Sequence, residues 1–89
     1  VSAFPNPSNG QTHLRYAVPA GYSGPVTLRI VDVAGRTVRR LIDKGQHGGE
    51  YQLIWEGADD AGRVVENGIY FARVEAGVDR ASTKIVVRR

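Results

Sequence analysis

The chain has 89 residues, of which 42% are hydrophobic and 24% are charged. This length allows one domain with a modest core and leaves little room for a deep substrate cavity, since such a domain buries only about 60–65% of its unfolded surface. Cysteine is absent, which excludes disulfides and cysteine-ligated metals. The net charge of +3 arises from basic residues interspersed with acidic ones, a pattern typical of solvated strand faces and not of nucleic acid binding.

The whole sequence, residues 1–89, is interpreted as a single domain. It starts with Val1 in a strand-like stretch and has no initiator methionine, so we expect a module of a larger protein. No run of about 18 apolar residues occurs, and membrane insertion is therefore not expected.

The first half of the chain alternates apolar and polar residues with the period of two that β-strands require. A short strand at 2–4 leads into a proline-rich segment that is stiff and extended. Strands are expected at 12–18 and 26–33, separated by turn-forming residues. A return strand is expected at 36–42, where the adjacent apolar residues 41–42 leave one turn of helix as an alternative.

The second half continues the same pattern, with strands expected at 50–56, 69–76 and 80–88. Trp55 is the largest apolar side chain and is expected in the core. Tyr70 follows a turn at the start of a late strand, as a tyrosine-corner residue would, with its hydroxyl bonded to backbone at the preceding corner. The fold class predicted is all-β: an immunoglobulin-like or fibronectin-III-like antiparallel β-sandwich of about seven strands.

No residues form a recognisable catalytic motif. His13 and His47 lack an orienting partner or a nucleophile in any known spacing, so neither catalysis nor a cofactor is expected. Asp59 and Asp60 are the one acidic cluster that could donate carboxylates to calcium, but turn formation is the favoured interpretation of these residues. We therefore predict no metal site, with calcium at this pair as a weak alternative.

An outward-facing stripe is the main candidate for a docking face. Val31 and Phe71 fall on the outer side of their strands by phase, and Arg29 and Arg73 share those sides. If the strands are neighbours, this apolar stripe edged with positive charge can dock a partner or an adjacent domain. The alternative is that these are scattered surface residues, which are normal in soluble proteins.

Seven short segments, in order and at the right spacing, resemble the FlgD-type Ig-like domains. This family includes the C-terminal sorting domains of proteins secreted by the bacterial type IX system. The resemblance covers nearly the whole chain. The segments are FPNP (4–7), LRY (14–16), VDVAGR (31–36), GEY (49–51), WEGADDAGR (55–63), GIYF (68–71) and KIVVRR (84–89).

The resemblance implies a non-catalytic C-terminal module of a larger exported protein. Its partners would be proteins of the secretion machinery or the adjacent domain of the parent, and the domain is expected to be a monomer. Export would pass through the periplasm to the outer cell surface or the medium. The sorting signal would lie in the last strand, which we expect to be an edge that offers backbone pairing and exposed positive charge. Its residues are Lys84, Ile85, Val86, Val87, Arg88 and Arg89.

Two other functions stay open at this point. The domain could be a structural or accessory Ig-like module packed on a catalytic or adhesive domain of an extracellular enzyme; in the flagellar hook-capping protein a similar domain is an internal scaffold part. Carbohydrate binding is less favoured because it needs two or three exposed coplanar aromatic rings, and only Tyr22 and Phe71 are expected to be available.

Overall fold

The fold is built from five antiparallel β-strands that form one hydrogen-bonded sheet. A computed structural model describes residues 1–89. The order across the sheet is β1-β2-β4-β5, and β3 pairs with β2. No helix is long and apolar enough to cross a membrane. The strands are β1 (Ser2–Phe4), β2 (Thr12–Asp32), β3 (Thr37–Trp55), β4 (Gly68–Ala76) and β5 (Asp79–Val87).

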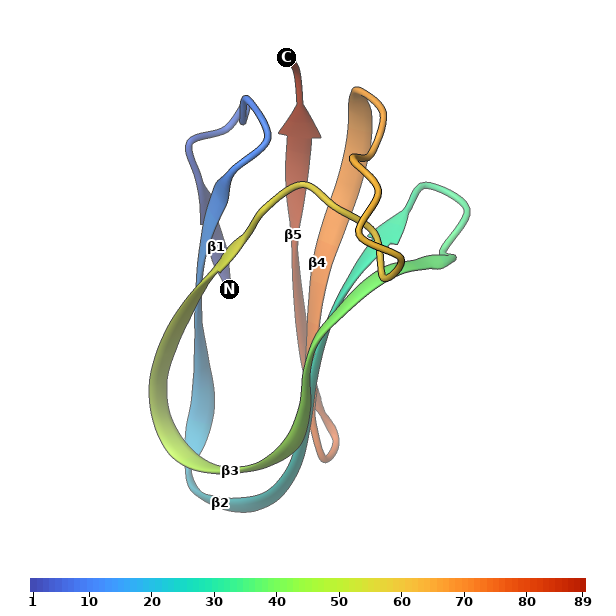
Figure 1. Cartoon of the computed structure of the whole chain (residues 1–89). Coiled ribbons are helices and arrows are strands. Elements are labelled where there is room, and N and C mark those ends of the chain that lie inside the picture. Colours follow the sequence, from blue (N-terminus) through green and yellow to red (C-terminus); the bar gives the residue numbers. More distant parts are fainter.

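Two of these strands are long and bend halfway along their length (Figure 1). β2 joins the strands expected at 12–18 and 26–33, and β3 joins those expected at 36–42 and 50–56. The pairing of β2 with β3 shifts register at the bend and then continues. The predicted number of about seven strands is therefore too high, because glycines and prolines at the bends interrupt the alternation without ending the strands.

The bends divide the sheet into two layers. β1 pairs only with the first half of β2, from Ser2 opposite Arg15 onward, and β4 pairs only with the second half, from Val26 opposite Ala76 onward. One layer thus contains β1 with the first half of β2 and the second half of β3. The other contains β4 and β5 with the remaining halves (Figure 1). This arrangement confirms the predicted immunoglobulin-like antiparallel sandwich.

A β-bulge explains the adjacent apolar residues Leu41 and Ile42, for which a helical turn was the alternative. Both lie within β3. Leu28 of β2 is opposite Ile42, and the next residue, Arg29, is opposite Arg40, so Leu41 is the extra residue of the bulge. The irregularity lets both side chains pack against the core, and the helical alternative is wrong.

One hydrophobic cluster joins the two layers, and all its members except Val65, which lies in the loop between β3 and β4, are alternate residues of the strands. The position in the core expected for Trp55 is confirmed. The 13 buried residues are Leu14, Tyr16, Val18, Val26, Leu28, Ile30, Trp55, Val65, Ala72, Val74, Ala76, Ile85 and Val87.

Trp55 and Tyr70 close one end of this core. Trp55 is 1% exposed, and its indole Nε1 donates to the carbonyl of Ala58 at 2.9 Å. The ring of Tyr70 meets it edge-on, with the ring centroids 5.6 Å apart. The hydroxyl of Tyr70 donates to the carbonyl of Glu66 at 2.7 Å, which is the bond of a tyrosine corner. Both predicted structural roles are confirmed.

A buried polar contact lies at the bend of β2 and β3. The hydroxyl of Tyr16 donates to Oε1 of Gln46 at 3.0 Å, and both side chains are buried. Burial raises the pKa of Tyr16 above its usual value, although the bond to Gln46 acts in the opposite direction. The hydroxyl therefore stays protonated and the bond holds the two bent strands together in the interior.

The closest approach of backbone at the bend generates a stability prediction for Gly48. A Cβ at this position would lie 2.5 Å from the carbonyl oxygen of Pro19 and 3.0 Å from Cα of Ala20. Because these are backbone atoms of a paired strand, Gly48→Ala is expected to lower the free energy of unfolding by about 1–3 kcal/mol.

Gly45 provides the matched control, since its Cβ would make only an ordinary contact of 3.7 Å with the carbonyl of Gly24. Gly45→Ala is expected to change stability by less than about 0.5 kcal/mol. Urea denaturation of both variants measures the difference. Equal unfolding free energies for the two variants would show that the backbone at Gly48 can move away from Pro19 and Ala20 without cost.

Candidate functional site

The last strand, β5, mixes core residues with outward ones. Ile85 and Val87 are 0% and 1% exposed and belong to the hydrophobic core. Lys84 and Arg88 are exposed, and Val86, between them, is half-buried. Of the segment expected to hold a sorting signal, these three side chains are therefore the ones that alternate onto the outer side of the strand.

The outer edge of β5 is occupied by the proline-rich segment before β2. The side chain of Asn6 accepts the backbone N–H of Val86 at 2.9 Å and donates to the carbonyl of Lys84 at 2.8 Å. The backbone N–H of Ser8 then donates to the carbonyl of Val86 at 2.7 Å, and the N–H of Arg88 donates to the carbonyl of Ser8 at 2.8 Å. We call this contact of Asn6 and Ser8 with β5 the edge clip.

The edge clip corrects the expectation that the last strand offers free backbone pairing. From the carbonyl of Lys84 to the N–H of Arg88, the outward backbone groups already have partners. An asparagine carboxamide has an oxygen that accepts and an NH₂ group that donates, as a backbone peptide group does. Asn6 can therefore pair with β5 through its side chain, where the neighbouring prolines have no backbone N–H to donate. The sequence signal was an asparagine between Pro5 and Pro7, but its distant partner is not visible in the sequence.

Arg89 is anchored and is not a free charge. Its guanidinium donates to the carbonyl of Val65 at 2.6 Å and to that of Gly57 at 3.3 Å. Its backbone N–H donates to Oδ1 of Asn67 at 3.1 Å. Arg89 is exposed as expected, but these contacts also fix the long loop between β3 and β4 against the end of β5.

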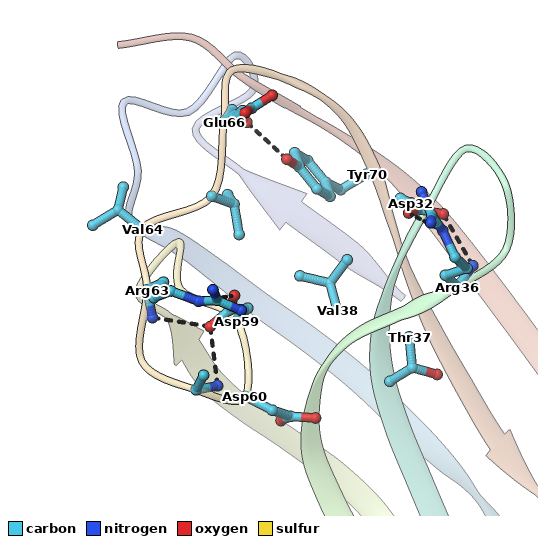
Figure 2. Close-up of a pocket in the computed structure, with 12 residues that line it drawn as sticks. Asp32, Arg36, Thr37, Val38, Asp59, Asp60, Arg63, Val64, Glu66 and Tyr70 are labelled. Atoms are coloured by element: carbon cyan, nitrogen blue, oxygen red, sulfur yellow. Dashed lines mark hydrogen bonds and ion pairs between the residues drawn. The ribbon is translucent and has the colours of Figure 1, made fainter.

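Two turns of the same sequence type, Asp-x-Ala-Gly-Arg, flank a hollow at this end of the sandwich (Figure 2). In the first turn the carboxylate of Asp32 accepts the backbone N–H groups of Ala34 and Arg36 and pairs with the Arg36 guanidinium at 3.2 Å. Asp59 makes the same contacts with Ala61 and Arg63, with an ion pair of 3.3 Å. Each turn thus neutralises its own carboxylate.

These contacts lower the pKa of both aspartates. The backbone N–H of Arg36 is the main cause for Asp32, and that of Arg63 is the main cause for Asp59. The second backbone donor and the arginine charge add to the effect, and partial burial acts against it. Both carboxylates are consequently ionised at neutral pH and held by the turn.

The hollow between the turns has a volume of about 690 Å³, with Val38 and Tyr70 between the two turns (Figure 2). Asp60 lies at its rim, and its Oδ1 accepts the backbone N–H of Arg40 at 2.9 Å and is 3.4 Å from Arg39. At Asp59 and Asp60 the structure favours turn formation over the calcium alternative, because both oxygens of Asp59 and Oδ1 of Asp60 are directed at protein donors. No three histidine, cysteine or acidic side chains are grouped to hold a metal ion.

The outer face of the β2–β4–β5 layer brings together the residues expected to form a docking face. Arg29 is directly opposite Arg73, and Val31 is directly opposite Phe71. Val31, however, is only 1% exposed, so its expected outward exposure is wrong. It lies between Phe71 on β4 and Thr37 on β3, and the guanidinium of Arg29 bonds to Thr37, so these neighbours cover it.

The histidines and the outward aromatic residues lie apart from one another in the fold. His13 stacks on Phe4, with ring centroids 5.2 Å apart, whereas His47 lies at the bend and accepts the hydroxyl of Tyr51 with its carbonyl. Tyr22 is also at the bend, where its hydroxyl donates to the carbonyl of Pro25. Phe71 is on the outer face of the other layer, so Tyr22 and Phe71 do not form a coplanar sugar platform.

The sequence model of the FlgD Ig-like domain matches residues 6–79, which is most of the chain. The chain belongs to the FlgD Ig-like domain family. This confirms the resemblance seen in the seven segments and agrees with the sandwich described above. No curated protein matches the sequence significantly.

Solved structures share the fold across most of this domain. A structure of dimeric latent PorU from Porphyromonas gingivalis matches with a TM-score of 0.68 and 22% identity, covering 97% of this chain and 9% of PorU. FlgD from Xanthomonas campestris, whose structure addresses hook capping in flagellar assembly, matches with a TM-score of 0.61 and 26% identity over 85% of this chain. FlgD from P. aeruginosa matches with a TM-score of 0.57 and 22% identity over 81% of this chain. The domain spans only 54% and 57% of these two FlgD chains.

The edge clip generates a prediction for Asn6→Ala. The change removes two hydrogen bonds to β5 and is expected to lower stability by about 1–2 kcal/mol. It should also accelerate hydrogen exchange of the Val86 amide, which loses its acceptor, by about tenfold. Asn9→Ala is the control, because Asn9 is exposed and makes no side-chain hydrogen bond. Unchanged protection of the Val86 amide in Asn6→Ala would contradict the clip.

The two aspartate turns generate a prediction about acid stability. Because the pKa of Asp32 and Asp59 is lowered in the folded state, their contribution is complete above the ordinary aspartate pKa of about 3.9 and is lost as the pH falls through the lower folded values. The unfolding free energy should therefore decline below about pH 4, and less steeply in Asp32→Asn/Asp59→Asn. Asp43→Asn, at an exposed residue without an ion pair, is the control. Carboxyl NMR titration showing ordinary pKa values at both turns would refute the prediction.

Proposed function

We propose that this domain is a non-catalytic sorting domain that the type IX secretion machinery recognises in its folded state. The parent protein would be exported through the periplasm and released or attached at the cell surface. The observation that carries the proposal is the presentation of β5. Its backbone is fixed by the core and the edge clip, and Lys84, Val86 and Arg88 are directed outward in one row.

The extent of the structural matches supports assigning the signal to β5. The family sequence model ends at residue 79, where β5 begins. The PorU match covers 97% of the chain, which is too much to omit this nine-residue strand. The resemblance of residues 84–89 to the basic-ended last strand of sorting domains therefore falls in a part of the chain that the family sequence model does not match.

The edge clip also determines how the signal would be recognised. A partner cannot add a strand along Lys84–Arg88 while Asn6 and Ser8 occupy that edge. Recognition through outward side chains requires no such displacement. The proposal is therefore that the machinery contacts the side chains of a folded β5.

The alternative function is an accessory Ig-like module packed on a neighbouring domain. The structural matches favour it in one respect, because domains with this fold form only a part of the PorU and FlgD chains. An accessory module would stabilise its parent without providing an export signal, so export measurements separate the two functions.

The test is an export assay with surface substitutions, because deleting residues 84–89 would remove Ile85 and Val87 from the core. Residues 1–89 are fused to the carboxyl end of a fluorescent reporter in a bacterium with a type IX system and in a strain without the translocon. Translocon-dependent reporter in the medium or at the surface is expected for the natural sequence. Lys84→Glu/Arg88→Glu should reduce it several-fold while the domain stays folded.

Arg15→Glu/Lys44→Glu is the control with the same charge change at exposed residues away from β5. Circular dichroism of the purified variants establishes that both remain folded. A periplasmic, folded fusion of the natural sequence would favour the accessory function. Equal export of the β5 variant and the control would exclude the outward side chains of β5 as the signal.

A further inference from the structure

The net positive charge of the chain is concentrated on the outer face of the β2–β4–β5 layer. Residues opposite one another in antiparallel strands share a face, so the strand register defines its members. Two acidic residues share this face with six basic ones, an excess of four positive charges. The basic residues are Arg29, Arg40, Arg73, Arg80, Lys84 and Arg88, and the acidic residues are Asp43 and Glu75.

Three of the arginines surround an open hollow of about 550 Å³ on this face. Its lining includes Arg29, Arg73, Arg80 and Ser82, with Glu75 as the only carboxylate. Because antiparallel strands place these side chains in adjacent rows, the guanidinium groups are directed into the same solvent-facing region.

The positive charge in the hollow is only partly neutralised within the domain. Arg29 pairs with Glu75 at 3.4 Å and also bonds to Thr37 at 2.9 Å. Arg73 and Arg80 form no ion pair, although both belong to the same hollow. Two guanidinium groups are therefore available to an external anion, and each can bind a carboxylate through two parallel hydrogen bonds.

An apolar strip lies beside the hollow on the same face. Phe71 is two residues from Arg73 along β4 and is opposite Lys84 of β5. Ile69, 43% exposed, is opposite Val86 in the next row. Aromatic side chains and arginine together are typical of the energetic centres of protein–protein interfaces. Recognition of a polyanionic sugar chain through charge alone would not use this apolar strip.

We propose that this face docks an acidic protein surface. Carboxylates of the partner would enter the hollow between Arg73 and Arg80, and an apolar side chain of the partner would cover Phe71 and Ile69. The inference does not depend on a sorting role, because an adjacent domain of the parent or a separate protein could supply the acidic surface. The partner surface is thereby expected to carry carboxylate groups next to an apolar side chain.

The test uses the 89-residue chain and an acidic peptide of about 20 residues. In this peptide, each glutamate is followed by one serine and one leucine. Amide chemical shifts are followed by NMR as the peptide is added. Shifts are expected at residues 71–75 and 80–84. Arg73→Gln/Arg80→Gln should weaken binding by about tenfold, and Phe71→Ser should weaken it as well.

Arg15→Gln/Lys44→Gln is the charge-matched control, since both residues are exposed and lie outside this face. Equal weakening by the two double variants, or shifts spread over the whole surface, would overturn the proposal by showing unspecific charge attraction. Dextran sulfate is the second probe. Binding of dextran sulfate at this face without binding of the peptide would also overturn it and would favour an anionic polysaccharide. An unchanged export assay with Arg73→Gln/Arg80→Gln would separate the hollow between Arg73 and Arg80 from the proposed signal at Lys84, Val86 and Arg88 on the same face.

Discussion

The whole fold depends on the sharp bend that β2 and β3 make together. A single sheet of five strands can enclose a core only if it turns back on itself, and these two strands carry the turn while staying paired. Gly48 allows the backbones to approach at the bend, and the buried bond between Tyr16 and Gln46 links the strands from within. The side chains of both layers can then meet in one cluster around Trp55.

A folded sheet of this kind leaves β1, β3 and β5 as edge strands, and neighbouring segments cover part of the edges of β5 and β3. Asn6 and Ser8 pair with the edge of β5 from Lys84 to Arg88. On β3, Asp60 occupies the edge near its start: its backbone N–H donates to the carbonyl of Val38, and its carboxylate accepts the N–H of Arg40. Covered edges resist unwanted strand pairing, which protects a small β domain from aggregation. Specific recognition is then left to outward side chains.

Periodicity was sufficient to predict the fold class and most inward positions, because alternation reports which side of a strand faces the core. It could predict Trp55 in the core and the Tyr70 corner from residue type and place. Prediction from periodicity failed where a sequence feature had two interpretations or depended on residues far away in the chain. Glycines at a bend resemble those of a loop, so bent strands were counted twice. The exposure expected for Val31 was wrong because Phe71 and Thr37, which flank it, lie on neighbouring strands, and the sequence of one strand does not reveal their register.

The same limit applies to the candidate site, where partners are far apart in the chain. Asn6 binds residues about 80 positions away, and Arg89 binds a loop more than 20 positions earlier. These contacts divide the basic residues into two groups with different roles. Arg36, Arg63 and Arg89 are each bound by a carboxylate or by backbone carbonyls at one end of the sandwich, where they stabilise turns and loops. Arg73 and Arg80, on the outer face, have no such partner, and a positive charge left unpaired by its own fold remains free to bind an anion from another molecule.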